Sequence, residues 1–477
     1  MSAPLQAAGG ARVARRFPAP ASRLAGIRRY RGGWGMPNGA SLVAMLAVTV
    51  VLVALAYGMN HSSYIVWGAF WVAPVLLILS LPVAKRAGRL DGDGIGRIVL
   101  VAAAVKVLAA PLVRYWMVYG LYGGGADATR YHTAGSLLAP FFRHGIYADL
   151  GQISGTRFVE VLTGQVYAFT GATRLGGFMV FSWFSFLGLY LFYRAFRTAY
   201  PDGDGRRYAL LVFFFPTLLF WPSSIGKEAI MMLVLGAVAL GAAQLLTGRF
   251  RGLVWLALGL WGAAVVRPHV ALIVAAGLVV AAPIAFLRVG AKRESRQRGR
   301  LGSAVLLLAL AISGSTLIGV AQDFLHLESL NTQTAQEQFD EVTRRSGEKG
   351  STFTPFSPNN PAGFVLSGIT VIFRPLPGEV RSGQGVVTSL ECLTLLALFL
   401  LGLRRLARLP LEILRRPYVA FSVVYTFAFI YAFSSIVNFG ILARQRSQLL
   451  PLVFVVLCIP RARASTERIP DRASTSR

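Results

Sequence analysis

Residues 208–246 read YALLVFFFPTLLFWPSSIGKEAIMMLVLGAVALGAAQLL, and they are apolar except for the short segment 221–228. A helix of about 20 apolar residues crosses the roughly 30 Å hydrocarbon core of a membrane. The apolar runs on either side of the segment therefore predict two membrane helices. A break that contains proline and serine at membrane depth needs protein or water to bond the freed backbone groups. We therefore expect this break to line a cavity.

The composition of the whole chain agrees with a membrane protein. Of its 477 residues, 55% are hydrophobic and 14% are charged, whereas soluble domains carry about 25% charged residues. The 48 Lys and Arg residues outnumber the 20 Asp and Glu residues, which gives a net charge of +28. A nucleic-acid-binding protein carries its basic charge on a polar, solvated face, so we exclude that class and expect the basic residues to face anionic lipids. Cys392 and Cys458 lie in separate apolar runs, which excludes a disulfide framework and a cysteine metal site.

Similar apolar runs recur along the chain. They predict an all-α, polytopic membrane protein with about 12 spans, within a range of about 10 to 13. The expected spans are 41–58, 64–83, 98–118, 174–193, 208–221, 228–247, 253–266, 270–288, 302–320, 386–403, 417–436 and 447–460.

Basic residues gather in alternate connecting segments, as the positive-inside rule requires of cytoplasmic segments. Residues 1–40 hold seven arginines and no acid, whereas residues 321–385 hold seven acids and five bases. We therefore expect both termini in the cytoplasm and the protein in a bacterial cytoplasmic membrane. The expected parts are a disordered cytoplasmic tail (1–40), a membrane domain (41–460) with outer loops 119–173 and 321–385, and a second cytoplasmic tail (461–477).

The first expected outer loop carries a candidate catalytic residue, Asp127. It follows three glycines at 123–125, which let the backbone bend sharply. A carboxylate at the mouth of a span can take a proton from an attacking hydroxyl. The alternative is that Asp127 caps a short interfacial helix whose aromatic residues rest on the membrane surface. Further candidates for binding a phosphate or a sugar are Arg130, Tyr131 and His132.

The break at 221–228 ends in a second pair of candidates, Lys227 and Glu228. The lysine is suited to binding an anion, and the glutamate to pairing or to acid-base work. The alternative is a hairpin tip whose lysine extends to the membrane surface.

Arginines on the expected outer side form a third group of candidates. A guanidinium keeps its charge and offers a fork of donors suited to phosphate. If these arginines face one cavity, they form a polyanion site, whereas each alone is equally well explained as a lipid headgroup contact. The candidates in this group are Arg267, Arg374, Arg444 and Arg446.

His269 follows Arg267 closely, and the neighbouring cation disfavours a protonated imidazole. A neutral, hydrogen-bonding role is therefore expected for it. The five histidines show no paired spacing, so we expect no transition-metal centre. A divalent cation held by Asp127 and a phosphate is compatible with the sequence, which specifies no cofactor.

The order of these features resembles the GT-C class of membrane glycosyltransferases, which use polyprenyl-phosphate-linked sugars. The resemblance covers roughly residues 98–288, although the acid here follows the third expected span and stands alone. It implies that Asp127 is the catalytic base. The residues that carry it are Gly125-Ala126-Asp127, Tyr131, Ala134, Gly145-Ile146-Tyr147, residues 163–167, Thr170-Gly171 and the expected helix 175–194.

The outer arginines are also similar to those of O-antigen and exopolysaccharide polymerases. Either resemblance implies an inverting transfer from a polyprenyl-linked sugar donor to a glycan or lipid acceptor at the outer membrane face. Asp127 would take the acceptor proton, and Lys227, Arg267, Arg374 and Arg444 would neutralise the departing phosphate. The rival hypotheses are a transporter or flippase for an anionic glycolipid, which would show paired broken helices, and a structural scaffold. The expected partners are these substrates and membrane lipids, with no nucleic acid; the oligomeric state is left open.

Overall fold

The structure, a computed structural model, describes residues 39–147, 150–287, 293–325, 332–347, 352–380 and 382–460. The regular structure in these ranges is helical, and the only strand-like pairing in them is an isolated antiparallel bridge between Thr352 and Asn438. The expected all-α class is confirmed. The expected disordered tails lie outside the described residues, apart from positions 39 and 40.

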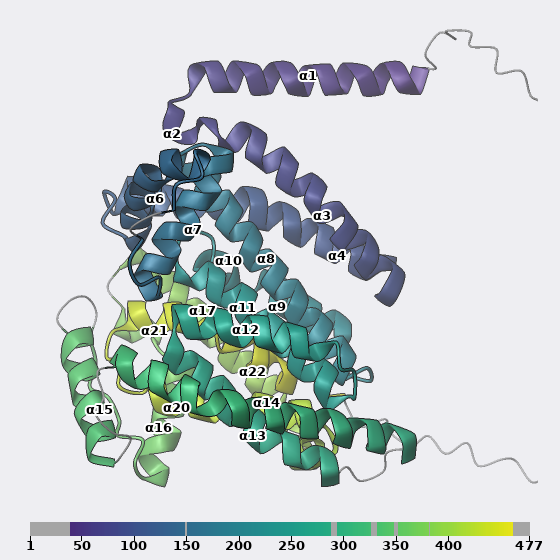
Figure 1. The fold of residues 1–477 in the computed structure, drawn as a ribbon, viewed down its shortest axis with the longest axis vertical. Coiled ribbons are helices and arrows are strands. Elements are labelled where there is room, and N and C mark those ends of the chain that lie inside the picture. The colour runs from purple at the N-terminus through teal and green to yellow at the C-terminus, as the bar shows by residue number, and fades with distance from the viewer. Residues whose placement is uncertain are drawn as a thin grey trace, which may run out of the picture. The chain divides into compact units, whose positions relative to one another are not determined.

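The helices follow one another in the order drawn in Figure 1. They are α1 (Gly39–His61), α2 (Tyr64–Trp67), α3 (Ala69–Asp91), α4 (Asp93–Ala104), η1 (Val105–Ala109), α5 (Ala110–Trp116), η2 (Met117–Leu121), α6 (Asp127–Arg143), α7 (Gly155–Thr170), α8 (Arg174–Ala199), α9 (Gly205–Phe214), α10 (Pro216–Phe220), α11 (Lys227–Leu246), α12 (Gly252–Val266), α13 (Pro268–Leu287), α14 (Arg293–Leu325), α15 (Thr332–Gly347), α16 (Pro361–Phe373), η3 (Pro377–Glu379), α17 (Gly383–Leu401), α18 (Leu403–Leu406), α19 (Leu409–Arg415), α20 (Pro417–Phe433), α21 (Phe439–Arg446) and α22 (Leu450–Leu457).

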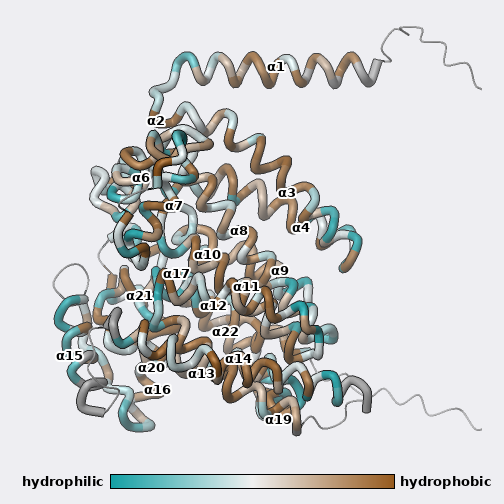
Figure 2. Tube along the Cα trace, in the orientation of Figure 1, coloured by the Kyte–Doolittle hydropathy of each residue, from teal (hydrophilic) through white to brown (hydrophobic). Residues whose placement is uncertain are grey.

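Among the described residues, seven helical segments are long and apolar enough to cross a membrane, and the number rises to nine if each of two bent helix pairs forms one span. Figure 2 shows the apolar residues spread along these helices, with hydrophilic residues gathered in the connections and in α15. The segments are Tyr64–Asp91, Asp93–Leu121, Arg174–Ala199, Lys227–Leu246, Pro268–Phe286, Gln297–Gln322 and Gly383–Leu401, and the bent pairs are α19 with α20 and α21 with α22.

Several expected spans differ from the helices observed, among them 417–436 and 447–460, which fall in the two bent helix pairs. Residues 208–221 fall into two short helices, α9 and α10, because Pro216 lacks a backbone N–H and begins a new helix. Residues 253–266 lie in α12, which has 15 residues. The count of about 12 spans and the cytoplasmic placement of both termini therefore stay predictions.

The chain divides into two compact units, Met1–Ala54 and Leu55–Arg477. The described part of the first unit is the beginning of α1. The second unit contains all the other helices and the candidate site.

Helices α8 and α11 are the most buried of the membrane-length helices, and they pack against each other. A Cβ atom on Gly188 would lie 2.3 Å from the carbonyl oxygen of Met232, and one on Gly236 would lie 2.3 Å from the carbonyl oxygen of Gly188. The two backbones therefore touch, as they do where small residues face each other in membrane helices. This close pair fixes where α11 begins, and so where Glu228 stands.

The break between α10 and α11 is held by a fully buried lysine, Lys106, from the π-helical turn η1. Its Nζ donates to the carbonyl oxygens of Leu218 and Leu219, at 3.1 and 3.4 Å, and to Oγ of Ser223 at 2.8 Å. The carbonyl groups freed at the end of α10 are thus bonded by protein, which is the condition for irregular backbone at membrane depth.

Candidate functional site

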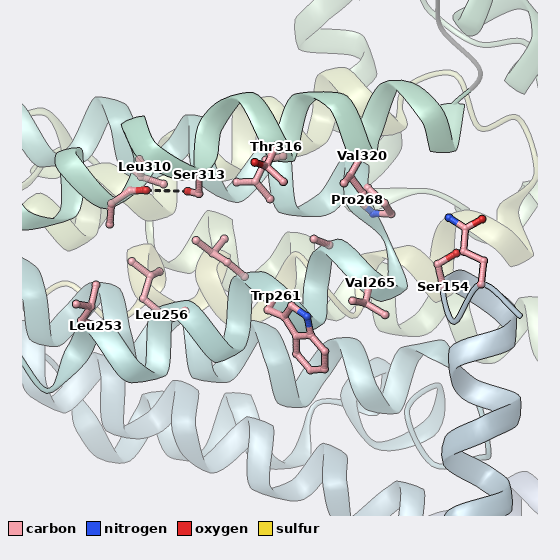
Figure 3. Close-up of a pocket in the computed structure, with 16 residues that line it drawn as sticks. Ser154, Leu253, Leu256, Trp261, Val265, Pro268, Leu310, Ser313, Thr316 and Val320 are labelled. Carbon is pink, nitrogen blue, oxygen red and sulfur yellow. Dashed lines mark hydrogen bonds between the residues drawn. The ribbon is translucent and has the colours of Figure 1, made fainter. Parts of the chain in front are cut away.

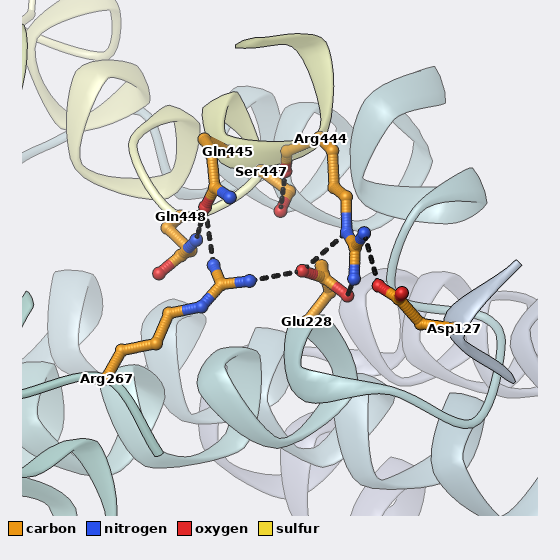
Figure 4. A network of polar contacts seen from close by, with 7 residues as sticks. All are labelled: Asp127, Glu228, Arg267, Arg444, Gln445, Ser447 and Gln448. Atoms are coloured by element: carbon orange, nitrogen blue, oxygen red, sulfur yellow. Dashed lines mark hydrogen bonds and ion pairs between the residues drawn. The ribbon is translucent and has the colours of Figure 1, made fainter. Parts of the chain in front are cut away.

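Four charged side chains from four separate segments meet beside α21, as Figure 4 shows. Asp127 begins α6, Glu228 lies in the first turn of α11, Arg267 follows the end of α12, and Arg444 lies in α21. Asp127 and Arg444 are 317 positions apart in the sequence. The site is therefore assembled by the packing of the helices.

Arg444 bonds both carboxylates of this group. Its Nη1 lies 2.8 Å from Oδ2 of Asp127, and its Nε and Nη2 lie 2.7 and 2.9 Å from Oε1 and Oε2 of Glu228. The contact with Glu228 is bidentate, which is also the geometry in which a guanidinium binds phosphate.

Arg267 bonds Glu228 from a second direction. Its Nη2 lies 2.6 Å from Oε1 of Glu228, and its Nη1 donates to Oε1 of Gln445 at 2.5 Å. Gln448 donates to the same oxygen of Gln445 at 2.7 Å. The charges of the two arginines balance those of Asp127 and Glu228, and the neighbouring Lys227 adds a further positive charge to the site.

The loop before α6 positions Asp127 through glycine conformations. Gly123 and Gly124 have φ values of +56° and +83°, which side-chain-bearing residues rarely adopt. Thr129 fixes the turn by donating to the carbonyl oxygen of Gly124 at 2.7 Å. Ala126, with extended backbone, is the N-cap residue, so Asp127 stands one position further on, in the first helical turn. The alternative prediction, in which Asp127 is the N-cap residue of this helix, is therefore wrong.

Two cavities share Asp127, Arg130 and Arg444, so the Asp127–Arg444 ion pair forms part of the wall between them. The first, which we call the Lys227 cavity, has a volume of about 330 Å³ and is also lined by Tyr131, Thr156, Lys227, Arg267, His269 and Gln445. The second, which we call the Arg114 cavity, has a volume of about 460 Å³, and its further lining includes Arg114, Tyr122, Trp221, Ser224, Glu228 and Gln384.

An apolar groove of about 810 Å³ runs between α12 and α14 (Figure 3). Leucine, alanine and valine side chains and Trp261 line most of its length, and Ser154 and Pro268 lie at one end. Pro268 stands between Arg267 and His269 in the sequence, and both of these line the Lys227 cavity. The groove therefore ends beside the Lys227 cavity.

Most of the site residues predicted from the sequence line one or both cavities. Arg130 lines both, and its Nε also bonds Oε1 of Glu160 at 2.9 Å. Burial and the nearby carboxylates of Asp127 and Glu228 raise the pKa of Tyr131 to about 12, so Tyr131 is a neutral hydrogen-bonding phenol. The predicted residues that line a cavity are Asp127, Arg130, Tyr131, Lys227, Glu228, Arg267, His269 and Arg444.

His132 lies outside both linings. Its Nδ1 is 2.8 Å from the hydroxyl oxygen of Tyr167. Burial, with a smaller effect of Arg174, lowers its pKa from 6.5 to about 4. His132 is therefore neutral near pH 7 and links α6 to α7.

Arg374 and Arg446 also lie apart from the two linings. Arg374 pairs with Glu379, and its guanidinium lies 4.8 Å from the centre of the Phe353 ring. Arg446 is 1% exposed and donates from Nε to the carbonyl oxygen of Val371 at 3.0 Å, from Nη1 to the sulfur of Cys392 at 2.8 Å, and from Nη2 to the carbonyl oxygen of Arg374. Both arginines hold α21 against the segments around α16 and α17.

Sequence reasoning missed Arg114, Gln384 and Gln445. A charged residue inside an expected span signals function by default, and Arg114 lies inside the expected span 98–118, so its signal was present. Lys106 gives the same signal from the same span, yet it serves the break after α10. The two glutamines carry no comparable signal, because an amide is as common on a solvated surface as in a site.

No group of three or more His, Cys, Asp or Glu side chains that could hold a metal ion occurs among the residues that the structure places. The carboxylates of Asp127 and Glu228 are the acidic groups nearest to such a role. The guanidinium of Arg444 bonds both of them, so it occupies the position that a bridging cation would take.

Comparison of the chain with protein-family models, with curated proteins and with solved structures finds no match.

Proposed function

We propose that this protein is a membrane glycosyltransferase. It would move a sugar from a polyprenyl-(di)phosphate-linked donor to an acceptor hydroxyl at the outer face of a bacterial cytoplasmic membrane, in the assembly of cell-envelope glycans. The observation that carries the proposal is the position of Asp127. Its carboxylate borders two cavities at once and lies within one connected group of fixed cations.

The proposed chemistry is an inverting displacement. Asp127 takes the proton from the acceptor hydroxyl, and the acceptor oxygen attacks the anomeric carbon of the donor sugar. The new glycosidic bond forms while the bond from the anomeric carbon to the phosphate oxygen breaks, and the electron pair of that bond leaves with the phosphate. The side chain of Asp127 is 56% exposed, so it is open to substrate.

The cations of the Lys227 cavity are suited to the leaving phosphate. Lys227, Arg267 and Arg444 all line this cavity, and fixed cations stabilise the charge that develops on a leaving group in a water-poor site. Arg444 holds Oδ2 of Asp127 at 2.8 Å in the structure. When Arg444 turns toward a bound phosphate, both oxygens of Asp127 become available to the acceptor. Arg374 lines neither cavity and has no part in this scheme.

The apolar groove supports a donor that carries a long hydrocarbon chain. It lies between α12 and the membrane-length helix α14 and ends beside the Lys227 cavity, so a chain in the groove would bring its phosphate to the cations. In the proposed topology of about 12 spans with both termini in the cytoplasm, this end of the groove faces outward.

A polysaccharide polymerase would use the same chemistry with a growing glycan as acceptor. A transporter for an anionic glycolipid would use the same cations with no proton transfer. The exposed carboxylate of Asp127 beside fixed cations supports an enzyme over the transporter, which needs no base.

The test is transfer of a labelled sugar from a polyprenyl-linked donor by the purified full-length chain in lipid vesicles. We expect Asp127→Asn to lower the rate by about 100-fold or more, because general base catalysis contributes about 10²–10⁴-fold. Asp93→Asn is the matched control, since Asp93 is exposed in the first turn of α4 and lines neither cavity. Equal rates for wild type and Asp127→Asn would remove the proposed base.

A further inference from the structure

Arg114 is a buried guanidinium inside a membrane-length helix. It lies in α5, within the segment Asp93–Leu121, and is 9% exposed. Its charged carbon lies 4.6 Å from the centre of the Phe220 ring and 4.9 Å from that of Trp221. These aromatic faces attract the cation and fix its position, but they accept none of its hydrogen bonds in the usual geometry.

Two of the three guanidinium nitrogens of Arg114 have unsatisfied hydrogen-bond donors within the described chain. Nε and Nη1 are buried and have no hydrogen-bond partner there. An arginine cannot shed its proton to escape this cost, and buried charges are normally paired. The two carboxylates of the same cavity, Asp127 and Glu228, are bonded by Arg444 instead. The described part of the protein therefore supplies no hydrogen-bond acceptor for Nε and Nη1 of Arg114, and a bound ligand could supply one.

The surroundings of Arg114 indicate what kind of molecule brings that acceptor. The aromatic residues Tyr122 and Trp221 and the polar residues Ser224 and Gln384 line the Arg114 cavity. Aromatic faces with a few polar groups suit a sugar ring, because the ring has apolar C–H faces and a hydroxyl edge. A volume of about 460 Å³ accommodates such a ring with a charged substituent.

Only one of the two cavities, the Lys227 cavity, lies beside the apolar groove. The apolar groove reaches the Lys227 cavity through Pro268, which lies between two residues of its lining. The groove lining shares no residue with either cavity, but only the Lys227 cavity has lining residues, Arg267 and His269, that flank a groove residue in the sequence. A donor whose chain lies in the groove thus takes the Lys227 cavity, and the Arg114 cavity is left on the acceptor side of Asp127.

We propose that the Arg114 cavity is a second anion-binding subsite, and that Arg114 binds an acidic group on the acceptor. The group is a carboxylate of an acidic sugar or a phosphate of a lipid-linked glycan, because the unpartnered N–H donors of Arg114 form charge-assisted hydrogen bonds with the oxygens of either group. The assignment of this ligand as the acceptor rests on the proposed function, whereas the binding of an anion by Arg114 does not.

The test measures binding, by titration calorimetry of the full-length chain in detergent, of methyl glucuronide, methyl glucoside and geranylgeranyl phosphate. We expect wild type to bind the glucuronide at least about tenfold more tightly than the glucoside, or to bind two molecules of geranylgeranyl phosphate. Arg114→Gln should remove the glucuronide preference if the group is a carboxylate, or one of the two lipid sites if it is a phosphate. Lys227→Gln is the matched control, and it should weaken the other lipid-phosphate site alone.

Two results would overturn the proposal. One is wild-type protein that binds the glucuronide and the glucoside equally and takes up a single geranylgeranyl phosphate, a comparison that needs no variant to fold. The other is an equal weakening of one and the same ligand by Arg114→Gln and Lys227→Gln, which would mean a single site. Arg114→Lys keeps the charge against the aromatic rings but loses the fork, so we expect it to fold and to bind with intermediate affinity. Because the readout is binding, it is independent of whether Asp127→Asn abolishes transfer.

Discussion

Glu228 accepts hydrogen bonds from two guanidiniums at once, and its carboxylate is almost completely buried. Arg267, which follows α12, and Arg444 of α21 approach it from different directions, at 2.6 Å and 2.7 Å from Oε1. Its place in the first turn of α11 also puts the negative charge near the positive end of the helix dipole. Glu228 therefore links both arginines, which are also bonded to Asp127 and to Gln445.

Replacing Glu228 by Gln should destabilise the fold by about 3–5 kcal/mol, because the buried Arg267 loses its charged partner and Arg444 keeps only Asp127. The measurement is the free energy of unfolding of the detergent-solubilised chain. Glu341→Gln is the matched control, since Glu341 also pairs with two arginines, Arg344 and Arg345, but at an exposed surface. We expect a much smaller loss there. Similar losses for the two variants would show that burial does not strengthen the contacts of Glu228.

Because of His132, the free energy of unfolding should decrease as the pH falls below 6.5. Its pKa is about 4 in the folded chain and 6.5 as the ordinary value, because burial and Arg174 disfavour the charged ring. The unfolded chain therefore binds a proton first, and the stabilisation from a neutral His132 is complete above pH 6.5 and is lost as the pH falls toward 4. The difference in unfolding free energy between wild type and His132→Gln should shrink over this interval. A constant difference from pH 7 to pH 4 would contradict the low pKa.

At the scale of elements, the crossing of α8 and α11 decides where the candidate site can form. The two helices touch through Gly188 and Gly236, where any added Cβ meets backbone at 2.3 Å. The start of α11 is therefore held at a fixed depth, and Lys227 and Glu228 with it. The break before α11 is bonded by Lys106, so α10 and α11 keep separate directions.

Gly188→Val should separate α8 from α11 and destabilise the fold by about 3 kcal/mol or more, because overpacking at a tight contact forces the backbone to move. The yield of monodisperse protein and its thermal unfolding temperature are the measurements. Gly94→Val is the matched control, since a Cβ at Gly94 meets nothing within 4 Å. The explanation fails if both variants unfold at the same temperature.

At the scale of the whole described chain, the apolar groove leads to the Lys227 cavity, and both cavities are lined by charged side chains. The groove is formed by α12 and α14, and the cavities by segments from α5 to α21. A lipid-linked substrate has the same order of parts, with a hydrocarbon chain, a phosphate and a sugar. The arrangement suits such a substrate better than it suits a small soluble one.

Filling the groove should impair long-chain donors selectively. Ala309 lines the groove on α14, and Ala309→Trp would occupy the space of several chain carbons. We expect the KM for a long polyprenyl donor to rise at least about tenfold, because each buried CH₂ contributes about 0.8 kcal/mol, while the KM for a donor with a chain of two isoprene units changes little. Leu308→Trp is the matched control, since Leu308 is 61% exposed and lies outside the groove lining. Equal effects on short and long donors would mean that the chain lies elsewhere.

The sequence by itself determined the helical membrane class, the break at 221–228 and most of the charged residues that line the cavities. These features are local, because apolar length and the cost of a charge or a proline in a span can be judged within about 20 residues. It could not separate Arg446, which bonds the backbone around α16, from Arg444, two positions earlier, which bonds Asp127 and Glu228. Nor could it tell Lys106, which bonds the end of α10, from Arg114, whose donors await a ligand. Only the tertiary structure decided these roles, because the partner of each charge comes from a helix distant in the sequence and is set by how the helices pack.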